Sequence, residues 1–370
     1  MPDPISIRPV HGGNLSWAAA VAGCSPDSLL DFSASINPLG PPDSVTQAML
    51  GAIAGLRHYP DPQYRELCQA LGDHHQIDPA WVLPGNGAAE LLTWAARDFD
   101  RSLQATHPAR AVYLLTPAFG DYQRALKAFD VPIQSWPILG ADDEVTLSLG
   151  HKPGMPPGAA GLVVNNPHNP TGHLFSTCDL LPYLDQFDPV VVDEAFMDFV
   201  PPPQQQSLLP WVAGHPNLVI LRSLTKFYTL PGLRLGYAIG HPDRLRRWQQ
   251  WRDPWPVNGL AAAAAMAAVA DHEFQTRTWR WLGPARQALF EGIQAIPGLS
   301  PLPGAANYLL VRSGRSVLEL QVALLKPHQI LIRDCLSFPE LGEHYFRVAV
   351  RTPAENQRLL LGLRPIASED

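Results

Sequence analysis

The sequence contains few cysteines, and this argues against two kinds of architecture. Only four occur among 370 residues, at Cys24, Cys68, Cys178 and Cys335, and no two of them form a CxxC pair. A disulfide framework or a zinc site would need closely and regularly spaced ligands. We therefore expect reduced thiols and no metal site, as is typical of a cytoplasmic chain.

Long apolar segments and runs of basic residues are also missing. The most apolar segment, Ala261–Ala270, is too short to span a bilayer and is followed by Asp271, so it predicts a buried helix. The start, Met1–Pro4, lacks the basic and apolar regions of a signal peptide. The net charge is −7 and no Lys/Arg-rich run occurs, which argues against a nucleic-acid partner. We expect neither a membrane nor a nucleic acid as partner, although a few local arginines suffice to bind a small anion.

Short apolar runs predict buried parallel strands in an α/β sheet. They are separated by helix-like stretches and lie at Val112–Leu115, Leu162–Val164, Val190–Val192 and Leu218–Leu221. Polar residues follow each run, and the ligand crevice of an open α/β sheet lies at these carboxyl ends. The residues that follow the four runs are therefore expected to line one pocket.

The pattern changes after Asp271 and predicts a second, smaller α+β domain. A helix is expected over about residues 273–296, then strands at Tyr308–Val311 and Tyr345–Val350 with a further helix between them. The length of the chain also exceeds that of a usual single core. We expect an N-terminal arm over 1–45 that packs with the small domain, a large domain over 46–260, and an interdomain helix with the small domain over 261–370.

A lysine in the segment Ser223–Lys226 is the strongest candidate for catalysis. Lys226 follows the hydroxyls of Ser223 and Thr225, and Arg234 comes eight positions after it. A partly desolvated lysine can trap an aldehyde as an imine, while the hydroxyls and the arginine could bind a phosphate of the same cofactor. Taken alone, Lys226 would more often be a surface lysine.

Three further segments carry candidate ligands, and each also has a simpler interpretation. Asp193 ends the Val190–Val192 run, where it could pair with a cationic nitrogen or cap a helix. The segment 165–172 reads Asn-Asn-Pro-His-Asn-Pro-Thr-Gly, which is either a binding turn around Asn169 or only a Pro/Gly turn. Gly87 and Ala88 precede an apolar helical stretch, and the amides of such a helix start could bind a phosphate.

Together these motifs resemble those of the fold-type I, aspartate-aminotransferase-like enzymes that use pyridoxal 5′-phosphate (PLP). The resemblance covers nearly the whole chain and implies a large domain with a mostly parallel central sheet and a smaller α+β C-terminal domain. It implies that Lys226 carries PLP as a Schiff base and that Asp193 pairs with the pyridine nitrogen. It also implies that Asn169 binds the phenolic oxygen, and that the PLP phosphate is bound by Gly87, Ala88, Ser223, Thr225 and Arg234.

Three further positions bear on this resemblance. Two of them match the family, and the third departs from its pattern. Phe119 falls where the family stacks an aromatic ring on the pyridine, although alone it could equally be a core residue. Tyr59 resembles the tyrosine that reaches the phosphate in the neighbouring subunit, which implies a homodimer with shared active sites. Phe196 stands where many aminotransferases have a tyrosine that donates to the phenolic oxygen, which argues against ordinary transamination.

The N-terminal segments resemble one branch of the family, the L-threonine-O-3-phosphate decarboxylases of cobalamin biosynthesis. They read His-Gly-Gly-Asn from His11 and Asp-Phe-Ser-Ala-Ser-Ile-Asn-Pro-Leu-Gly over 31–40, with Ser35 where that branch often has asparagine. The branch implies a phosphorylated amino acid as substrate and PLP-dependent decarboxylation as the reaction. It further implies that Arg347 binds the carboxylate, that Arg333, His11 and Asn37 bind the phosphate, and that Asn169 also contacts the substrate.

The main alternative is a histidinol-phosphate aminotransferase, which shares the fold and the recognition of a phosphorylated amine. Phe196 and the His-Gly-Gly-Asn start argue against it. A PLP-sensing transcription regulator would need a winged helix, for which the chain has no room before residue 30. A catalytically inactive homologue is disfavoured because Asn169, Asp193, Lys226 and Arg234 are all present.

Overall fold

The described part of the chain forms two units, each of which contains one main sheet. The computed structural model describes residues 8–106, 111–140, 143 and 161–367, so Met1–Pro4 lie outside the described residues. The large unit comprises residues 39–169 and 174–278, and the small unit comprises the described parts of 1–38, 170–173 and 279–370. The domain boundaries at 45/46 and 260/261 stay a prediction.

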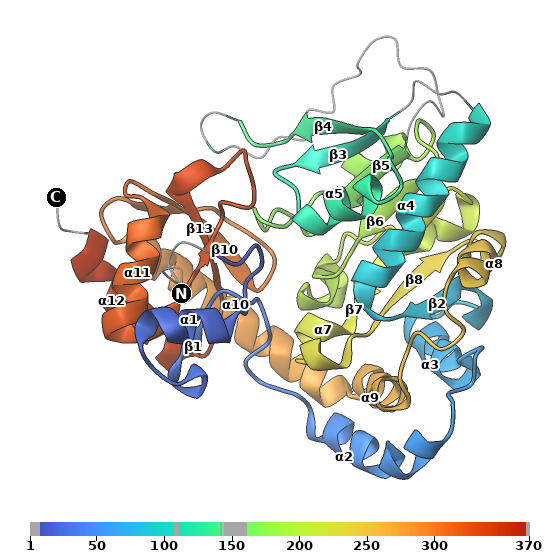
Figure 1. Ribbon diagram of the computed structural model, residues 1–370, viewed down its shortest axis with the longest axis horizontal. Coiled ribbons are helices and arrows are strands. Elements are labelled where there is room, and N and C mark those ends of the chain that lie inside the picture. Colours follow the sequence, from blue (N-terminus) through green and yellow to red (C-terminus); the bar gives the residue numbers. More distant parts are fainter. Residues whose placement is uncertain (1–7, 107–110, 141–142, 144–160, 368–370) are drawn as a thin grey trace. The chain divides into compact units, whose positions relative to one another are not determined.

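A seven-stranded, mostly parallel sheet is the core of the large unit (Figure 1). In spatial order its strands are β2 (Val82–Gly85), β8 (Gly236–Gly240), β7 (Leu218–Ser223), β6 (Val190–Asp193), β5 (Gly161–Asn165), β3 (Val112–Thr116) and β4 (Ile133–Pro137). Only β8 runs antiparallel to its neighbours. The four predicted strands are thereby confirmed, and the mostly parallel sheet with them.

Valine side chains suit the middle strands of this sheet, which are buried on both faces. Val190, Val191 and Val192 of β6 are at most 1% exposed, and a branched side chain suits the extended backbone of a covered parallel strand. One face of the sheet is covered by α4 (Gly87–Thr106), α5 (Gly120–Lys127) and α8 (Pro242–Trp251) (Figure 1). Side chains of these helices and of the strands form one buried apolar cluster, which stabilises this face of the sheet.

The remaining helices of the large unit include the predicted alanine-rich one. They are α2 (Asp43–Ala52), α3 (Arg65–His75), α6 (Thr177–Leu180), α7 (Leu224–Phe227) and α9 (Gly259–Ala270). Asn258 caps α9 by accepting a hydrogen bond from the Ala261 N–H at 2.8 Å. Small alanine side chains let α2 and α3 pack closely against α9. Among the described helices, none combines the length and apolar character that a membrane crossing needs.

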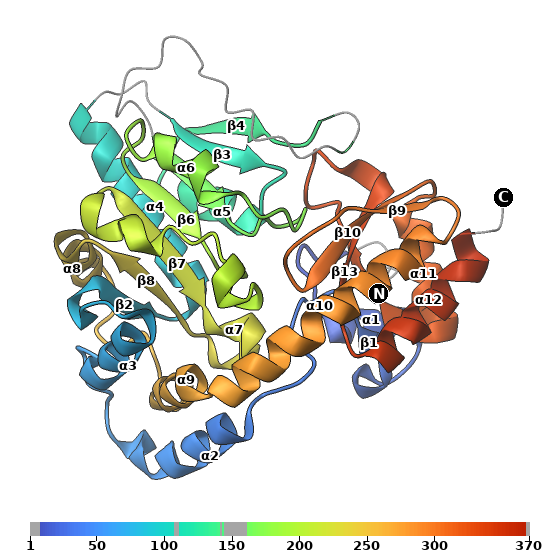
Figure 2. The same cartoon turned by 180° about the vertical axis from the view of Figure 1, so that it is seen from behind.

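The small unit is an antiparallel sheet flanked by helices, as predicted for the C-terminal part. Its strands follow the order β12 (Arg333–Asp334), β13 (Tyr345–Ala349), β10 (Tyr308–Ser313) and β9 (Leu299–Pro301), and its helices include α11 (Val317–His328) and α12 (Pro353–Ala367). The predicted helix over 273–296 is α10 (His272–Gln294), which contains the boundary between the units at residues 278/279 (Figure 2).

The N-terminal segment belongs to the small unit through a short parallel pairing. Strand β1 (Leu30–Asp31) pairs with β11 (Ile330–Leu331), and helix α1 (Leu15–Ala22) packs on α11. Ala18, Val21, Leu325 and Leu331 form the buried core of this contact. The pairing fixes the chain on either side of residues 23–29 and so holds the N-terminal arm beside β12.

Candidate active site

The register of the large sheet brings three predicted phosphate-binding segments to one edge. Ser223 at the end of β7 lies opposite Gly236 of β8, which in turn lies opposite Gly85 at the end of β2. Because β8 is antiparallel, its beginning lies at the carboxyl edge of its neighbours. Arg234 comes just before β8 and Gly87 just after β2, so both start from this edge.

Gly87 lets the arginine approach the start of α4. Its φ is +77°, and a Cβ at this position would lie 2.7 Å from Nη2 of Arg234. Ala88 follows in the first turn, where helix N–H groups lack acceptors within the helix. The hydroxyls of Ser223 and Thr225 lie 2.7 Å apart. A guanidinium, two hydroxyls and the amides of a 20-residue helix form a donor set that fits a phosphate.

The carboxylate of Asp193 is held by two hydrogen bonds at the end of β6. Its Oδ1 accepts from the Ala195 N–H at 2.9 Å, and its Oδ2 accepts from the Tyr122 hydroxyl at 2.6 Å. Burial raises the pKa of this carboxyl, while the charge of Lys226 and the two hydrogen bonds oppose that rise. The carboxylate is thus buried, oriented and close enough to Lys226 to feel its charge, which fits a partner for a protonated ring nitrogen.

An aromatic ring lies beneath the amine of Lys226. The Nζ atom is 4.9 Å from the centroid of the Phe196 ring, a distance at which a ring face attracts an ammonium group. Phe196 stacks on Phe199 with centroids 6.4 Å apart, and Phe199 meets Phe227 edge to face at 5.1 Å. This stack fixes the ring that stands where many aminotransferases have a tyrosine.

Two other predicted residues, Phe119 and Asn169, are each connected to Asp193 by one residue that contacts both. Phe119 immediately precedes α5, and its ring meets the Tyr122 ring edge to face at 5.7 Å. The N–H of Asn169 donates to Oδ1 of Asn165 at 2.6 Å, and Nδ2 of Asn165 donates to the Asp193 carbonyl at 2.8 Å. Asn165 therefore ties the turn that carries Asn169 to the strand end that carries Asp193.

A buried ion-pair network joins the ends of β6 and β7. Arg222 binds Glu194 at 2.8 Å and Asp198 at 2.6 Å, and the Ser207 hydroxyl donates to Glu194 at 2.7 Å. Burial disfavours the charged guanidinium, but the two carboxylates outweigh it and raise the pKa of Arg222. Since Arg222 precedes Ser223 and Glu194 follows Asp193, the network fixes the two strand ends that carry these cofactor candidates relative to each other. The sequence places Glu194 and Arg222 after two apolar runs but does not predict their pairing, because the two residues meet only through the pairing of β6 with β7.

In the small unit, the two arginines predicted to bind substrate face each other across a strand pair. Arg333 of β12 lies directly opposite Arg347 of β13, and they are only 6% and 9% exposed. Burial lowers the pKa of Arg347, and the positive charge of Arg333 adds to that effect. The Arg347 guanidinium also lies 4.7 Å from the centroid of the Tyr308 ring. Like charges directly opposite destabilise a sheet, so a ligand with negative charge would stabilise this one.

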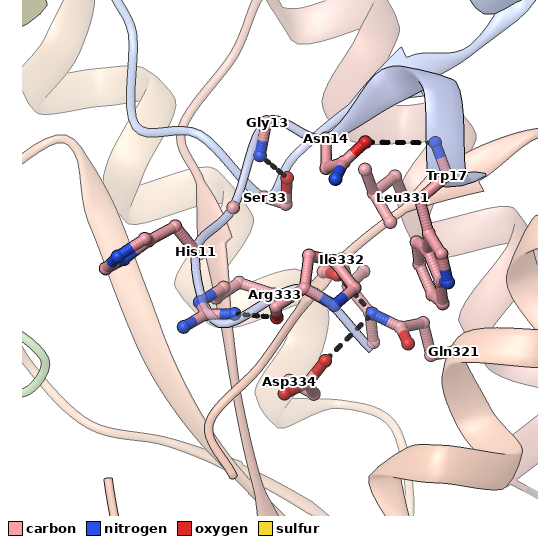
Figure 3. Close-up of a pocket in the computed structure, with 12 residues that line it drawn as sticks. His11, Gly13, Asn14, Trp17, Ser33, Gln321, Leu331, Ile332, Arg333 and Asp334 are labelled. Atoms are coloured by element: carbon pink, nitrogen blue, oxygen red, sulfur yellow. Dashed lines mark hydrogen bonds between the residues drawn. The ribbon is translucent and has the colours of Figure 1, made fainter. Parts of the chain in front are cut away.

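Arg333 also borders a pocket formed with the N-terminal arm (Figure 3). Its guanidinium donates to the carbonyls of Pro9 and Val10 and to the Ser337 hydroxyl. His11, which is exposed, lines the pocket together with Arg333. Asn37 is 1% exposed and belongs to the same unit, but it is not among the residues that line this pocket.

The comparisons with known proteins agree with this arrangement. The model of the aminotransferase class I and II family matches residues 27–363. The chain belongs to this family. The predicted membership and the predicted fold-type I architecture are both confirmed.

Within the aminotransferase class I and II family, the chain is similar to proteins of two activities. It is 40% identical over 365 residues to a threonine-phosphate decarboxylase of Salmonella typhimurium, with 96% of each chain covered. It is 33% identical over 348 residues to a histidinol-phosphate aminotransferase of Symbiobacterium thermophilum, which covers 92% of this chain and 91% of that protein. The similarity to the decarboxylase is the greater of the two.

A solved structure of the family has the same fold. The L-threonine-O-3-phosphate decarboxylase of Porphyromonas gingivalis superposes with a TM-score of 0.78 at 24% identity. The match covers 91% of this chain and 99% of that one.

The structure distributes the predicted residues of this family member over its two units. The large unit contains the described cofactor candidates, with Tyr59 exposed on its surface, and the small unit contains the substrate candidates other than Asn169. Tyr122 was missed, although its position three residues after Phe119 in a helical stretch places both on one helix face. The assignment of individual roles stays a prediction.

Proposed function

We propose that the protein catalyses the PLP-dependent decarboxylation of L-threonine O-3-phosphate to (R)-1-amino-2-propanol O-2-phosphate in cobalamin biosynthesis. The observation that carries this proposal is the similarity to the Salmonella threonine-phosphate decarboxylase, which spans nearly the whole chain. The opposed arginines of the small unit support it, because the substrate carries both a carboxylate and a phosphate. A cytoplasmic location stays a prediction from the sequence.

The cofactor candidates of the large unit have complementary tasks in this proposal. Bound PLP supplies an electron sink that stabilises negative charge on the substrate carbon when a bond to it breaks. Asp193 keeps the ring nitrogen protonated, and Phe119 stacks on the ring. Asn169 would donate to the phenolic oxygen. The phosphate would be bound by the donor set described above, which comprises Gly87, Ala88, Ser223, Thr225 and Arg234.

The substrate candidates act as two anion clamps. Arg347 binds the carboxylate, and Arg333 binds the phosphate with help from His11 and Asn37. The orientation in which these residues would hold the substrate would decide which of its bonds breaks. A clamp on each anionic group therefore selects decarboxylation by orientation, without a special base for the Cα proton.

Lys226 carries the cofactor and later supplies a proton. As a free amine, Nζ of Lys226 would hold a proton near Asp193 and over the ring of Phe196. We assign to it the delivery of this proton to the substrate carbon that has lost its carboxylate. A phenylalanine at 196 contributes no hydroxyl that could exchange protons with the cofactor.

The active form in this proposal is a homodimer with shared sites. Among the described residues of the large unit, five large apolar side chains are more than 40% exposed: Leu50, Ile53, Leu56, Tyr59 and Trp255. The rings of Tyr59 and Trp255 stack with centroids 4.4 Å apart, which holds Tyr59 outward. This apolar surface suits a second copy of the chain, whose cofactor phosphate Tyr59 would reach.

A direct assay tests the reaction. Protein reconstituted with PLP is expected to release CO2 from L-threonine O-3-phosphate without any 2-oxo acid, because the electrons return to the substrate carbon as a C–H bond. Lys226→Ala is expected to lose the visible absorbance of bound cofactor on dialysis and to lose activity by several orders of magnitude. Amino transfer from histidinol phosphate to 2-oxoglutarate without CO2 release would instead establish the aminotransferase alternative.

A further inference from the structure

The hydroxyl of Tyr122 has an unusual place among the buried groups of the large unit. Tyr122 lies in the first turn of α5 and is 3% exposed. Its hydroxyl donates to Oδ2 of Asp193 at 2.6 Å, and Asp193 is 5% exposed. A tyrosine hydroxyl brought out of water needs a partner, but a backbone carbonyl would serve for stability alone. Here the partner is the carboxylate that the proposed function pairs with the cofactor.

The two hydrogen bonds of Asp193 are divided between its oxygens. Oδ1 accepts from the Ala195 N–H and Oδ2 accepts from Tyr122. Each carboxylate oxygen has two lone-pair sites, so one donor on each oxygen fixes the plane of the group and leaves acceptor capacity on both. The carboxylate can therefore receive a ring N–H without losing either support.

The charges around Asp193 act in opposite directions. Lys226 on α7 favours the ionised carboxylate, whereas Asp121, which precedes Tyr122 on α5, disfavours it. The hydrogen bonds from Tyr122 and from the Ala195 N–H favour the ionised form, and burial disfavours it most strongly. The hydrogen bond from Tyr122 does not depend on the charge of the Lys226 amine.

Tyr122 also contacts the side chain predicted to cover the cofactor ring. Its ring meets the Phe119 ring edge to face at 5.7 Å and an interplanar angle of 86°. The Tyr122 N–H donates to the Phe119 carbonyl at 3.1 Å, which fixes the start of the helix. One side chain thus supports both the carboxylate and the stacking ring.

We propose that Tyr122 is a positioning residue that keeps Asp193 ionised and oriented toward the pyridine nitrogen of PLP. It acts through Asp193 and needs no contact with the substrate. The inference rests on the proposed function only in that PLP is the cofactor. It is independent of whether the reaction is decarboxylation or amino transfer.

The sign of the pH dependence follows from the hydrogen bond. Tyr122→Phe removes a donor that favours the ionised carboxylate, so the pKa of Asp193, already raised by burial, rises further. The variant therefore loses the charged form at a higher pH than the wild type does. Its defect should be large on the acid side and smaller in alkaline solution.

The test measures PLP affinity by titrating cofactor-free full-length protein at about pH 6 and about pH 8.5, on either side of neutrality. We expect Tyr122→Phe to weaken PLP binding by about tenfold to a hundredfold at the lower pH, as for a lost hydrogen bond to a charged group, and by less at the higher pH. The matched control is Tyr113→Phe, since Tyr113 on β3 packs its ring against Trp136 and Phe187. It should leave the affinity unchanged at both values.

A double-mutant cycle separates this role from general loss of packing. In an Asp193→Asn background, Tyr122→Phe should cause no further loss of PLP affinity, because the charge that it supports is gone. Additive losses, or a loss in Tyr122→Phe that is the same at both pH values, would overturn the inference. A wild-type protein that does not bind PLP would overturn the proposed function instead, so the two failures are distinguishable.

Discussion

At the scale of single residues, the most informative feature is the electrostatic repulsion between two buried arginines of the small unit. Arg333 and Arg347 are buried cross-strand neighbours, and Arg333 additionally holds the carbonyls of Pro9 and Val10. Carbonyl dipoles offset only part of a positive charge. The remaining charge is available to a ligand that carries more than one negative group.

Removing the Arg333 guanidinium should therefore weaken substrate binding more than it slows the chemical step. We expect Arg333→Gln to raise KM for L-threonine O-3-phosphate by roughly tenfold to a hundredfold, with a smaller change in kcat. Arg312→Gln is the matched control, because Arg312 is an exposed arginine of the same sheet. A fall in kcat with KM unchanged would show that Arg333 does not bind the substrate.

The sequence could identify candidate site residues because the cofactor constrains their types and their order along the chain. Asp193 ends β6 and Lys226 follows β7 by three residues, and the apolar runs of both strands are visible in the sequence. It did not predict Tyr122 or the Arg222 network. Their partners come from distant parts of the chain, and only the paired strands and packed helices bring them within hydrogen-bonding distance.

At the scale of elements, close packing of α4 on β5 fixes the sheet beneath the cofactor candidates. Phe99 of α4 is 1% exposed and lies over Gly161, the first residue of β5. A Cβ at Gly161 would overlap the Phe99 ring. The glycine is required here by the close approach of a helix, and not by its backbone conformation.

We expect Gly161→Ala to lower the free energy of unfolding by about 1–3 kcal/mol, as overpacking does in other cores. Gly120→Ala is the control, because no atom lies within 4 Å of a Cβ built at that helix position. It should change the free energy of unfolding by less than about 0.5 kcal/mol. Denaturant unfolding of both variants measures the difference, and equal values would contradict this account of the packing.

The elements also show where sequence patterns fail. The strands β3, β5, β6 and β7 were predicted because they are continuous apolar runs. Strand β8 was not, since Gly-Tyr-Ala-Ile-Gly is short and bounded by glycine, which is unfavourable in strands. Pairing with β2 and β7 makes this segment a strand. A Cβ at Gly236 would lie 2.7 Å from the Ala88 nitrogen, so only glycine lets the strand lie against the start of α4.

At the scale of the whole molecule, the proposed homodimer makes activity depend on association. Exposed apolar side chains in the described part of the large unit include Leu50, Ile53, Leu56, Tyr59 and Trp255, and the proposal places them in the interface. Leu56→Asp should place a charge in the interface, shift the protein toward monomers and reduce activity at least tenfold. Sedimentation velocity and activity would be measured on the same samples.

Leu361→Asp provides the control for an equally exposed leucine elsewhere. Leu361 on α12 is 54% exposed and Leu56 is 57% exposed, but Leu361 belongs to the small unit. We expect this variant to retain both the association state and the activity of the wild type. A Leu56→Asp protein that is monomeric and fully active would contradict shared active sites.

The facing arginines have a consequence for discrimination among amino acids. Under the proposed function, a substrate without its phosphate would bring one negative group to two guanidinium groups and leave one buried positive charge without a counter-charge from the ligand. Free threonine would therefore gain less from this pair of arginines than its phosphate ester does. The pair would discriminate between the two amino acids by that difference in affinity.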